Sequence, residues 1–590
     1  KIDAYKTPQD SRINSPVTLF SAFAYYIKNM KIMLKTTFAL TWGWLVAALL
    51  TLNIFLGSAS AQGKLPSNTR HLPKDATAII SVRIGDLLKK GGYEEFLQSD
   101  LVKMAKAEMV DNELALKILD DPEASGIDLG EPIHIFIKLG APAEEFGEPT
   151  VTGGLITSLK DAKALDKAID LITAKAGLPL IKTAQEGYTQ LSMPGAPATI
   201  GWTSKAMVAV GSSDPKQMQK IANLLDKTIN RKAKIKDERL VSLLSTKADM
   251  SAWIEYDQIV GLMSSIPGAE EAFGFGLTEK LSKNAAYALT MNFEAGRMDM
   301  AAVEYNETEL IEGDLSRGGL DKALVDLIPN NSIMAMGFAM NMKPMREMMN
   351  KHVLPELLAQ EGVEEMVTQA EAMIGLTLEG LMEIPKGDFL AVWDGLKMEE
   401  GDFGPQPSPQ LMLGMTVENR KNLNKIMNNP QVQGLLPMLA TVGMQIAQTE
   451  EGIFLCSRNH ANAINNGKNE NPIKGDHRDL ISKNDFGGFF RFAPLVKVIR
   501  GMVPPDAAEV QTALGELNRL DEITMSGSML KDGKQSSSVS LTFKDKKTNA
   551  LRQLIQTGER IYKLAQMAEA GRPDFELEAE EQPNVAVELE

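Results

Sequence analysis

The chain carries the same succession of sequence blocks twice, and an internal repeat constrains the fold more than any single motif does. "LPKDATAIISVRIGDLL" at residues 72–88 has a counterpart in "IPNNSIMAMGFAMNMKP" at residues 328–344, an offset of 256. "EPIHIFIKLG" from Glu131 matches "GDFLAVWDGL" from Gly387 at the same offset. In both halves these blocks predict a turn, a strand, the start of a helix and then a second strand.

Two further blocks follow in the same order. "ITSLKDAKALDKAI" from Ile156 matches "GMTVENRKNLNKIM" from Gly414 at an offset of 258. "SAWIEYDQIVGLM" from Ser251 matches "GGFFRFAPLVKVI" from Gly487 at an offset of 236. Four blocks in one order, with slowly drifting offsets, predict two tandem, duplicated halves.

Each half also closes with a hairpin signal. "YALTMNFEAGRMDMAAVEY" turns at Ala295-Gly296, and "ITMSGSMLKDGKQSSSVSLTF" turns at Asp532-Gly533, which is the stronger cue for a type I′ turn. Alternating strands joined by amphipathic helices predict a mainly antiparallel sheet with helices packed on it. Because the continuous apolar runs of doubly wound parallel sheets are mostly absent, the predicted fold class is α+β.

The predicted organisation has four parts, with the boundary between the halves at "LSRGGLD" (Leu315 to Asp321). The final stretch is acidic and has little to bury, so we expect it to be disordered. The parts are an over-extended N-terminus plus signal peptide (1–61), a first α+β repeat half (62–320), a second α+β repeat half (321–568) and an acidic disordered tail (569–590).

The longest uncharged stretch predicts export. It follows Lys28, Lys31 and Lys35, contains "FALTWGWLVAALLTLNIFLG" and ends in the small-x-small sequence Ala-Ser-Ala, with Ala61 last. We expect cleavage near Ala61 and an extracytoplasmic location in the periplasm, at the cell surface or in the medium. The apolar segment is long enough to span a bilayer, so an uncleaved signal anchor stays open as an alternative.

Charge and cysteine content exclude some functions. Without residues 1–61, 56 basic and 75 acidic residues leave a net charge of −19. A nucleic-acid partner is therefore not expected, because phosphate binding requires a basic face that displaces counterions.

The single cysteine, Cys456, can form no internal disulfide, and its surroundings predict a buried strand thiol.

"HRDLISKNDFGG", from His477 to Gly488, matches the kinase catalytic-loop pattern and also contains D-F-G. Asp485 follows Asp479 by only six positions, too few to place a base and a magnesium-holding carboxylate on separate loops. The sequence shows no glycine-rich phosphate loop, V-A-I-K strand or A-P-E either. In the repeat Asp485 falls on Asp249, so we interpret the segment as a helix end and turn that lead into a strand.

Methionine is abundant, with 32 residues, and several fall at alternate positions in "IMAMGFAMNMKP". Thioethers favour Cu(I), so Met-based copper binding is one alternative. Methionine is also a flexible core filler, and we favour that role and expect no metal site and no cofactor. The residues in question are Met334, Met336, Met340 and Met342, which we place with Phe338 on one face of a strand.

Two weaker metal signals lead to the same expectation. The five histidines lie far apart without helical ligand spacing: His71, His134, His352, His460 and His477. "DPEASGIDLGEP" imitates a calcium loop, but Pro132 stands where a bidentate Glu is required. We predict a helix-to-strand turn there.

The start of the predicted mature chain, "LPSNTRHLPKDATAIISVRIGDLLKKGGYEEFL", resembles a family of exported proteins found largely in Bacteroidetes, described as domain of unknown function 4836. The run P-K-D-A-x-A-I-I-S-V and the following L-L-K-K-x-G helix carry the likeness. "GIDLGEPIHIFIKL" and "GGLITSLKDAKALDKAI" are similar in kind. The resemblance covers residues 66–565, implies an exported α+β protein and brings no catalytic residues. Many members resemble lipoproteins, whereas Gln62 stands here where a lipidated cysteine would be, which puts the mode of membrane attachment in doubt.

These observations favour a non-enzymatic extracytoplasmic binding or structural protein, because two copies of a unit poor in reactive residues form a cleft or an extended surface. Its partner would be an envelope or extracellular molecule, with membrane contact only through an uncleaved anchor. The alternative is an envelope-associated hydrolase whose carboxylates are assembled in the fold, and copper binding is a third. We assign no catalytic residue.

Overall fold

The structure is a computed structural model. Residues 1–62, which contain the predicted signal peptide, and residues 571–590 of the predicted tail lie outside the described part. The described residues are 63–98, 102–103, 106, 113–140, 149–176, 180–231, 235–264, 283–308, 310–359, 362–401, 404–504 and 507–570.

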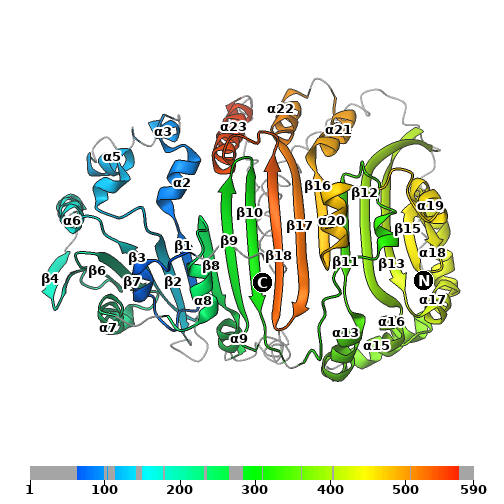
Figure 1. Cartoon of the computed structure of the whole chain (residues 1–590), viewed down its shortest axis with the longest axis horizontal. Coiled ribbons are helices and arrows are strands. Elements are labelled where there is room, and N and C mark those ends of the chain that lie inside the picture. Colours follow the sequence, from blue (N-terminus) through cyan, green and yellow to red (C-terminus); the bar gives the residue numbers. More distant parts are fainter. Residues whose placement is uncertain are drawn as a thin grey trace, which may run out of the picture. The chain divides into compact units, whose positions relative to one another are not determined.

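Within these ranges 18 strands form one sheet, and every strand pair in it is antiparallel (Figure 1). From edge to edge the order is β4, β5, β6, β7, β3, β2, β1, β8, β9, β10, β18, β17, β16, β11, β12, β13, β15 and β14. The strands before the predicted boundary are β1 (Ala78–Val82), β2 (Ile133–Gly140), β3 (Thr150–Ser158), β4 (Ile181–Gln185), β5 (Tyr188–Ser192), β6 (Ala198–Trp202), β7 (Ala206–Ser212), β8 (Met250–Glu255), β9 (Ala286–Glu294) and β10 (Arg297–Tyr305). Those after it are β11 (Met334–Ala339), β12 (Pro385–Gly401), β13 (Gly404–Val417), β14 (Met444–Gln448), β15 (Gly452–Ser457), β16 (Phe486–Arg491), β17 (Leu520–Lys531) and β18 (Lys534–Phe543).

Helices connect most of these strands, which confirms the predicted α+β class. None of the described helices is both long and apolar enough to cross a membrane. The described helices before the predicted boundary are η2 (Ser67–His71), α2 (Ile84–Gly91), α3 (Tyr93–Phe96), α5 (Glu113–Asp120), η3 (Pro122–Ser125), α6 (Ala162–Ala176), η4 (Pro215–Gln217), α7 (Met218–Ile229), α8 (Glu238–Leu244) and α9 (Tyr256–Ser264). After it they are α12 (Lys322–Val325), α13 (Met342–Met348), η5 (Met349–Val353), α14 (Leu354–Leu358), α15 (Val363–Ile374), α16 (Leu378–Met382), α17 (Arg420–Met427), α18 (Pro430–Thr441), α19 (Arg458–Asn465), α20 (Gly475–Ser482), α21 (Phe492–Met502), α22 (Ala508–Leu517) and α23 (Ala550–Ala570).

The strand order is the same on both sides of the β10–β18 pair. Outward from β10 the sheet runs through β9, β8, β1, β2, β3 and β7, and outward from β18 it runs through β17, β16, β11, β12, β13 and β15. The sequence blocks matched in the repeat therefore occupy corresponding strands. The tandem duplication itself stays a prediction, with which this order agrees.

The two hairpins lie where the sequence predicts them. The β17–β18 turn has Asp532 at φ 51° and Gly533 at φ 70°, the pair of positive values that a type I′ turn requires. The β9–β10 turn places Gly296 at φ 65°. These hairpins bring β10 and β18 next to each other, where Ser540 Oγ donates to Asp299 Oδ1 at 2.5 Å.

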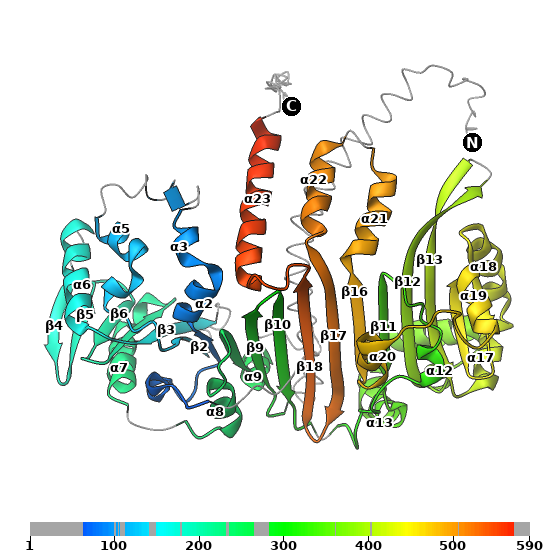
Figure 2. The ribbon, with the colours of Figure 1, turned by 45° about the horizontal axis from the view of Figure 1, so that its top comes forward.

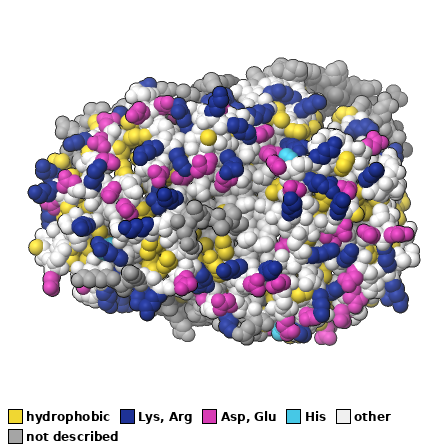
Figure 3. All heavy atoms as spheres, in the orientation of Figure 1, with side chains coloured by type: hydrophobic (Ala, Val, Ile, Leu, Met, Phe, Trp, Pro, Cys, Tyr) yellow, Lys and Arg dark blue, Asp and Glu magenta, His cyan; other side chains and the backbone are white. Residues whose placement is uncertain are grey.

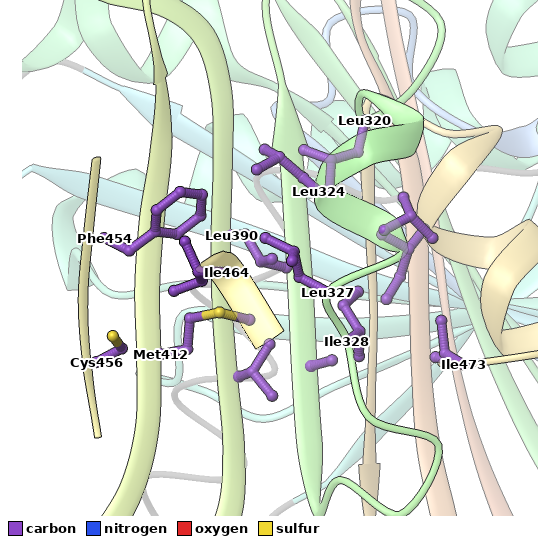
Figure 4. Packing of buried hydrophobic residues seen from close by; sticks show 14 of the residues in the cluster. Leu320, Leu324, Leu327, Ile328, Leu390, Met412, Phe454, Cys456, Ile464 and Ile473 are labelled. Atoms are coloured by element: carbon purple, nitrogen blue, oxygen red, sulfur yellow. The ribbon is translucent and has the colours of Figure 1, made fainter. Parts of the chain in front are cut away.

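Hydrophobic clusters lie along the sheet. One in the second half surrounds Phe454, Phe489 and Met412, and Figure 4 shows Cys456 beside Met412 in it. Cys456 is fully buried, and burial raises the pKa of its thiol to about 11, so the predicted buried strand thiol is confirmed.

Another cluster packs across the β10–β18 pair and joins elements from both halves. It includes Phe293 of β9 and Phe543 of β18, with Leu87 of α2 and Leu551 of α23 packed against it. Figure 2 shows α21, α22 and α23 at one end of these central strands. Since α23 also approaches α2 closely at Gly91, the last described helix packs against the first half.

Replacing Gly387 with alanine should destabilise the fold by more than about 2 kcal/mol, because its φ is 120° and an added Cβ would collide with the carbonyl oxygen of Met340. Gly434 in α18 is the matched control. An added Cβ there meets nothing within 4 Å, so Gly434→Ala should raise stability by about 0.5–1 kcal/mol. Chemical denaturation of both variants measures the contrast, and equal midpoints would contradict it.

Candidate functional site

A β-bulge in β12 places an acidic side chain against a buried histidine. Trp393 pairs with Leu411 and Gly395 pairs with Gln410, so Asp394 is the extra residue between them. Such bulges re-aim a side chain and are frequent next to functional sites. Asp394 Oδ2 lies 3.4 Å from Nε2 of His460 in α19.

The surroundings of this pair favour its neutral form. Burial raises the pKa of Asp394 and lowers the pKa of His460, although each group's charge opposes these shifts. His460 is 2% exposed, and its ring also donates a hydrogen bond to the backbone carbonyl of Gln410.

The pair itself and two serines, in β13 and β15, carry polar atoms without partners. Ser408 Oγ, Ser457 Oγ, Asp394 Oδ1 and His460 Nε2 are buried and have no hydrogen-bond partner among the described residues. We call these four residues the Asp394 cluster. Buried polar atoms without protein partners are commonly satisfied by ordered water, and this cluster suits that role.

The Asp394 cluster does not form a nucleophilic triad. In a triad one ring nitrogen faces the nucleophile while the other donates to the orienting acid. Here the ring donates to the carbonyl of Gln410, and Nε2 faces Asp394, so no nitrogen remains to activate Ser408 or Ser457. The pair therefore lacks the geometry of a nucleophilic site, and its histidine is buried.

Carboxyls with a raised pKa do not converge elsewhere in the described part. Burial also raises the pKa of Glu255 and of Glu304. Glu255 and Tyr305 both lie opposite Ala286, whereas Glu304 lies opposite the next residue, Tyr287. Because successive strand residues point to opposite faces, Glu255 and Glu304 lie on different faces of the sheet and cannot act as a pair.

The kinase-like segment has a structural role. Asp485 is 2% exposed, and its carboxylate accepts hydrogen bonds from four groups. These are Ser316 Oγ at 2.6 Å, Arg317 N at 2.7 Å, Met529 N at 2.9 Å and Gly318 N. Asp479 lies on the surface and pairs with Lys483 of the same helix at 2.8 Å. The two acids therefore do not share a site.

The corresponding acid of the first half makes similar bonds. Asp249 Oδ2 accepts from Phe293 N at 2.7 Å, and the backbone oxygen of Asp249 accepts from Arg83 N at 2.9 Å. Asp485 likewise accepts from Met529 N through its carboxylate and from Ala339 N through its backbone oxygen. In the first half Lys90 Nζ completes the site at 2.8 Å. In the second half the segment between the halves, which we call the linker, binds Asp485 through Ser316, Arg317 and Gly318.

The methionine prediction is right in part. Met334 and Met336 alternate with Phe338 on one face of β11, but that face is only half-buried, and Ala335, Gly337 and Ala339 form the buried face. Met340 follows the strand, and Met342 begins α13 instead of continuing it, because Asn341 caps that helix through Lys343 N at 3.3 Å. The copper alternative stays a prediction.

The histidines lie in separate places, as their spacing indicates. His134 bonds Ser81 Oγ at 2.6 Å and Asn68 Oδ1 at 2.9 Å inside the first half. His71 bonds the carbonyl of Thr228, His477 bonds Glu522, and His352 lies in η5. In the described ranges no three His, Cys, Asp or Glu side chains gather where they could hold a metal ion.

The calcium-like segment is a helix-to-strand turn, as predicted. It leads from α5 through η3 to β2, and Asp121 caps η3 by accepting from Glu123 N at 3.1 Å. Gly126 takes φ 81° and lies against the backbone of Asp161. Asp121 thus serves the backbone of its own turn.

Two open pockets occur on the surface. One of about 380 Å³ lies between the linker and the β17–β18 turn and is lined in part by Glu307, Asp314 and Asp532. The other, of about 240 Å³, is lined in part by Lys138 and Lys220. Neither pocket includes a member of the Asp394 cluster.

An exposed apolar surface lies on two helices of the second half. Met366 and Met438 are each 65% exposed, and further apolar side chains accompany them. Asn429, the N-cap of α18, donates to the carbonyl of Met373 at 2.7 Å, so the end of α15 adjoins the start of α18. We define the α15–α18 face as Met366, Ala370 and Met373 of α15 with Leu435, Met438 and Val442 at α18 and its C-cap.

Sequence reasoning missed both the Asp394 cluster and the α15–α18 face. The one signal for the first was a charged residue inside the apolar run "FLAVWDGL". A signal for the second was the 12-residue stretch "PQVQGLLPMLAT" of α18, which contains no charged residue. Neither signal shows which of these side chains the fold buries and which it leaves exposed.

Asp485→Asn should lower the free energy of unfolding by about 2–5 kcal/mol, since an amide NH₂ would face backbone N–H donors that the carboxylate now satisfies. Asp479→Asn is the control and should cost no more than about 0.5 kcal/mol, because it removes only an exposed i, i+4 pair. Urea denaturation measures both, and a neutral Asp485→Asn would refute the structural role.

Stability should fall as the pH drops below 6.5. Burial lowers the pKa of His134 from 6.5 to about 3, so between these values the unfolded chain binds a proton that the folded chain does not. Each such histidine lowers the free energy of unfolding by up to about 1.4 kcal/mol for each pH unit of this range. The pKa values of His71 and His460 are lowered too, so the variant His134→Gln should show a shallower slope, not a flat one.

Denaturation midpoints of both proteins between pH 7.5 and 5 measure this difference, because few carboxylates titrate in that window. Parallel curves for the wild type and His134→Gln would show that His134 is not buried in its neutral form.

Solved structures resemble the chain only distantly. Crystal form IV of TP0453 matches with a TM-score of 0.25 and 11% identity, over 41% of this chain and 81% of that one. Crystal form III of TP0453 matches with a TM-score of 0.23 and 11% identity, over 40% and 79%. No curated protein matches the sequence.

A family match covers more of the chain. The family described as Domain of unknown function (DUF4836) matches residues 68–435, which extend from η2 into α18 and include Asp394, α15 and the start of the α15–α18 face on α18. Because this match covers more than half of the 590 residues, the chain belongs to the DUF4836 family.

Proposed function

We propose that this chain is an exported, non-enzymatic binding protein that holds a partner on the α15–α18 face. The observation that carries the proposal is the exposure of large apolar side chains on two adjoining helices. Met366 and Met438 are 65% exposed, Val442 56%, Leu435 55% and Met373 51%. The two helices meet where α15 ends and α18 begins, and large exposed apolar patches mark interaction sites on soluble proteins.

The exposure follows from how the two helices pack. In α15 the half-buried residues are Val363, Val367 and Ile374, while Met366 and Met373 lie beside them and stay exposed. Each helix thus has an apolar arc wider than the part that the rest of the chain covers. The uncovered part of the arc is available to another molecule.

The same arrangement occurs in α18. Val432, Leu436 and Leu439 are half-buried and α18 packs against β14, whereas Leu435 and Met438 are exposed. Methionine suits such a surface because its flexible, polarizable side chain adapts to different partners.

The chemistry of the described residues favours binding over catalysis. His460, Ser408 and Ser457 of the Asp394 cluster are buried, and Glu255 and Glu304 lie on opposite faces of the sheet. The alternative, a hydrolase whose carboxylates are assembled in the fold, would require two carboxyls that converge on a cleft. We therefore keep the hydrolase as the second candidate, without a residue assignment.

Export is supported by the sequence alone. Three lysines precede the apolar stretch, and Ala-Ser-Ala ends at Ala61, so the mature chain would begin at Gln62. A partner would then be an envelope or extracellular molecule.

Cross-linked capture from envelope extracts tests the proposal. The bait is the chain from Gln62, compared with a face variant, Leu435→Ser/Met438→Ser/Val442→Ser. A matched control replaces three apolar residues elsewhere that are 48–51% exposed: Leu171, Ile181 and Met218. We expect a species that the wild type and the control capture and the face variant loses at least tenfold. Equal capture by all three baits would contradict the proposal.

A further inference from the structure

The acidic character of the chain around the α15–α18 face narrows the class of partner. Between residues 354 and 384, which include α14, α15 and α16, there are seven Asp or Glu residues and no Lys or Arg. Figure 3 shows acidic side chains gathered at the lower right edge, where Figure 1 places α13, α15 and α16. The apolar stripe of α15 therefore lies beside negative charge.

The acids of α15 border its apolar stripe. Glu364 and Glu365 occupy the first turn, where the helix dipole stabilises them, and both are exposed. Glu371 serves the fold, since its carboxylate accepts from Leu378 N at 2.8 Å. Glu364 and Glu365 thus remain for a partner.

Lysines lie on the helix that precedes α18. Lys421 and Lys425 of α17 are exposed, and α17 packs against α18. The acids of this surface thus lie on α15, and its lysines lie on α17. An occupant should carry an apolar stripe with basic side chains along the flank that meets α15.

We infer that the α15–α18 face binds a basic amphipathic helix from another protein. This inference rests on the proposed function and names the partner's chemistry. The spacing supports it, since Met366, Ala370 and Met373 recur at i, i+4 and i+7, and Leu435, Met438 and Val442 at i, i+3 and i+7. Methionine-bearing apolar surfaces with an acidic rim suit such helices, whose apolar face they bury while the acids pair with its basic residues.

Other occupants fit the face less well. An anionic bilayer surface would be repelled by the acids of α15 and α16. A basic helix satisfies both the apolar stripe and its acidic flank.

Fluorescence anisotropy with synthetic peptides tests the inference. The probe is a 14-residue helix of leucine and lysine with the leucines on one face, added to the chain from Gln62. One comparison peptide replaces the leucines with serine and keeps the charge, and another replaces the lysines with glutamate and keeps the apolar face. We expect micromolar binding of the probe and at least tenfold weaker binding of both comparison peptides.

Protein variants locate the binding. Leu435→Ser/Met438→Ser/Val442→Ser should weaken the probe at least tenfold, and Glu364→Lys/Glu365→Lys should weaken it about tenfold through lost charge pairing. The control Leu171→Ser/Ile181→Ser/Met218→Ser should bind like the wild type. Thermal melts of all variants verify folding. Because the replaced side chains are about half exposed, the substitutions should leave the fold intact.

Two results would overturn the inference. The first is equal binding of the lysine and glutamate peptides, or no dependence on the face variants. The second is face-dependent binding to phosphatidylcholine–phosphatidylglycerol vesicles without binding of the probe, which would assign the face to lipid. If envelope capture still depends on the face in either case, the proposed function stands and only the basic-helix partner is wrong.

Discussion

The antiparallel pairing of β10 with β18 is the contact on which the arrangement of the sheet depends. It joins strands whose paired residues lie 229 to 245 positions apart in the chain, and it makes one sheet from segments on both sides of the predicted boundary. Without it β10 and β18 would each be an exposed edge, and long open edges invite pairing with other chains. The cluster around Phe293 and Phe543 and the packing of α23 near α2 hold this pair from one face.

Buried carboxylates position the backbone around that sheet. Asp485 binds three backbone N–H groups and one hydroxyl, and Asp388 binds Thr416 Oγ1, Asp321 N and Arg317. Both acids therefore fasten the linker between the halves to the second half. This explains why a D-F-G sequence occurs in a chain without the remaining parts of a kinase. The aspartate satisfies backbone donors at the start of a strand, and glycine follows because an added Cβ on Gly487 would meet the carbonyl of Leu480.

Local sequence patterns predicted those features of the fold that depend on near neighbours. Alternation predicted β1, β2 and β16, and the Asp532-Gly533 pair predicted its turn, because these are decided within a few residues. The β10–β18 pairing could not be read in this way, since no local pattern specifies a partner so distant in the chain. Nor could the bulge at Asp394, which depends on the register between β12 and β13. Met342 was misplaced because alternation continues into α13, where the cap at Asn341 decides the structure instead.

The candidate site was harder to predict than the fold, for a related reason. Sequence periodicity shows that α15 and α18 are amphipathic, but it does not show how much of each apolar arc the rest of the chain covers. That depends on the angle at which α18 meets β14 and on the bond from Asn429 to the end of α15. Residue types can also indicate a reactive site where the geometry does not form one. Asp394 and His460 have the residue types of a reactive pair, yet the two ring nitrogens of His460 face the carbonyl of Gln410 and Asp394 itself. Both candidate sites thus depend on which side chains the fold covers, and that is set by tertiary packing.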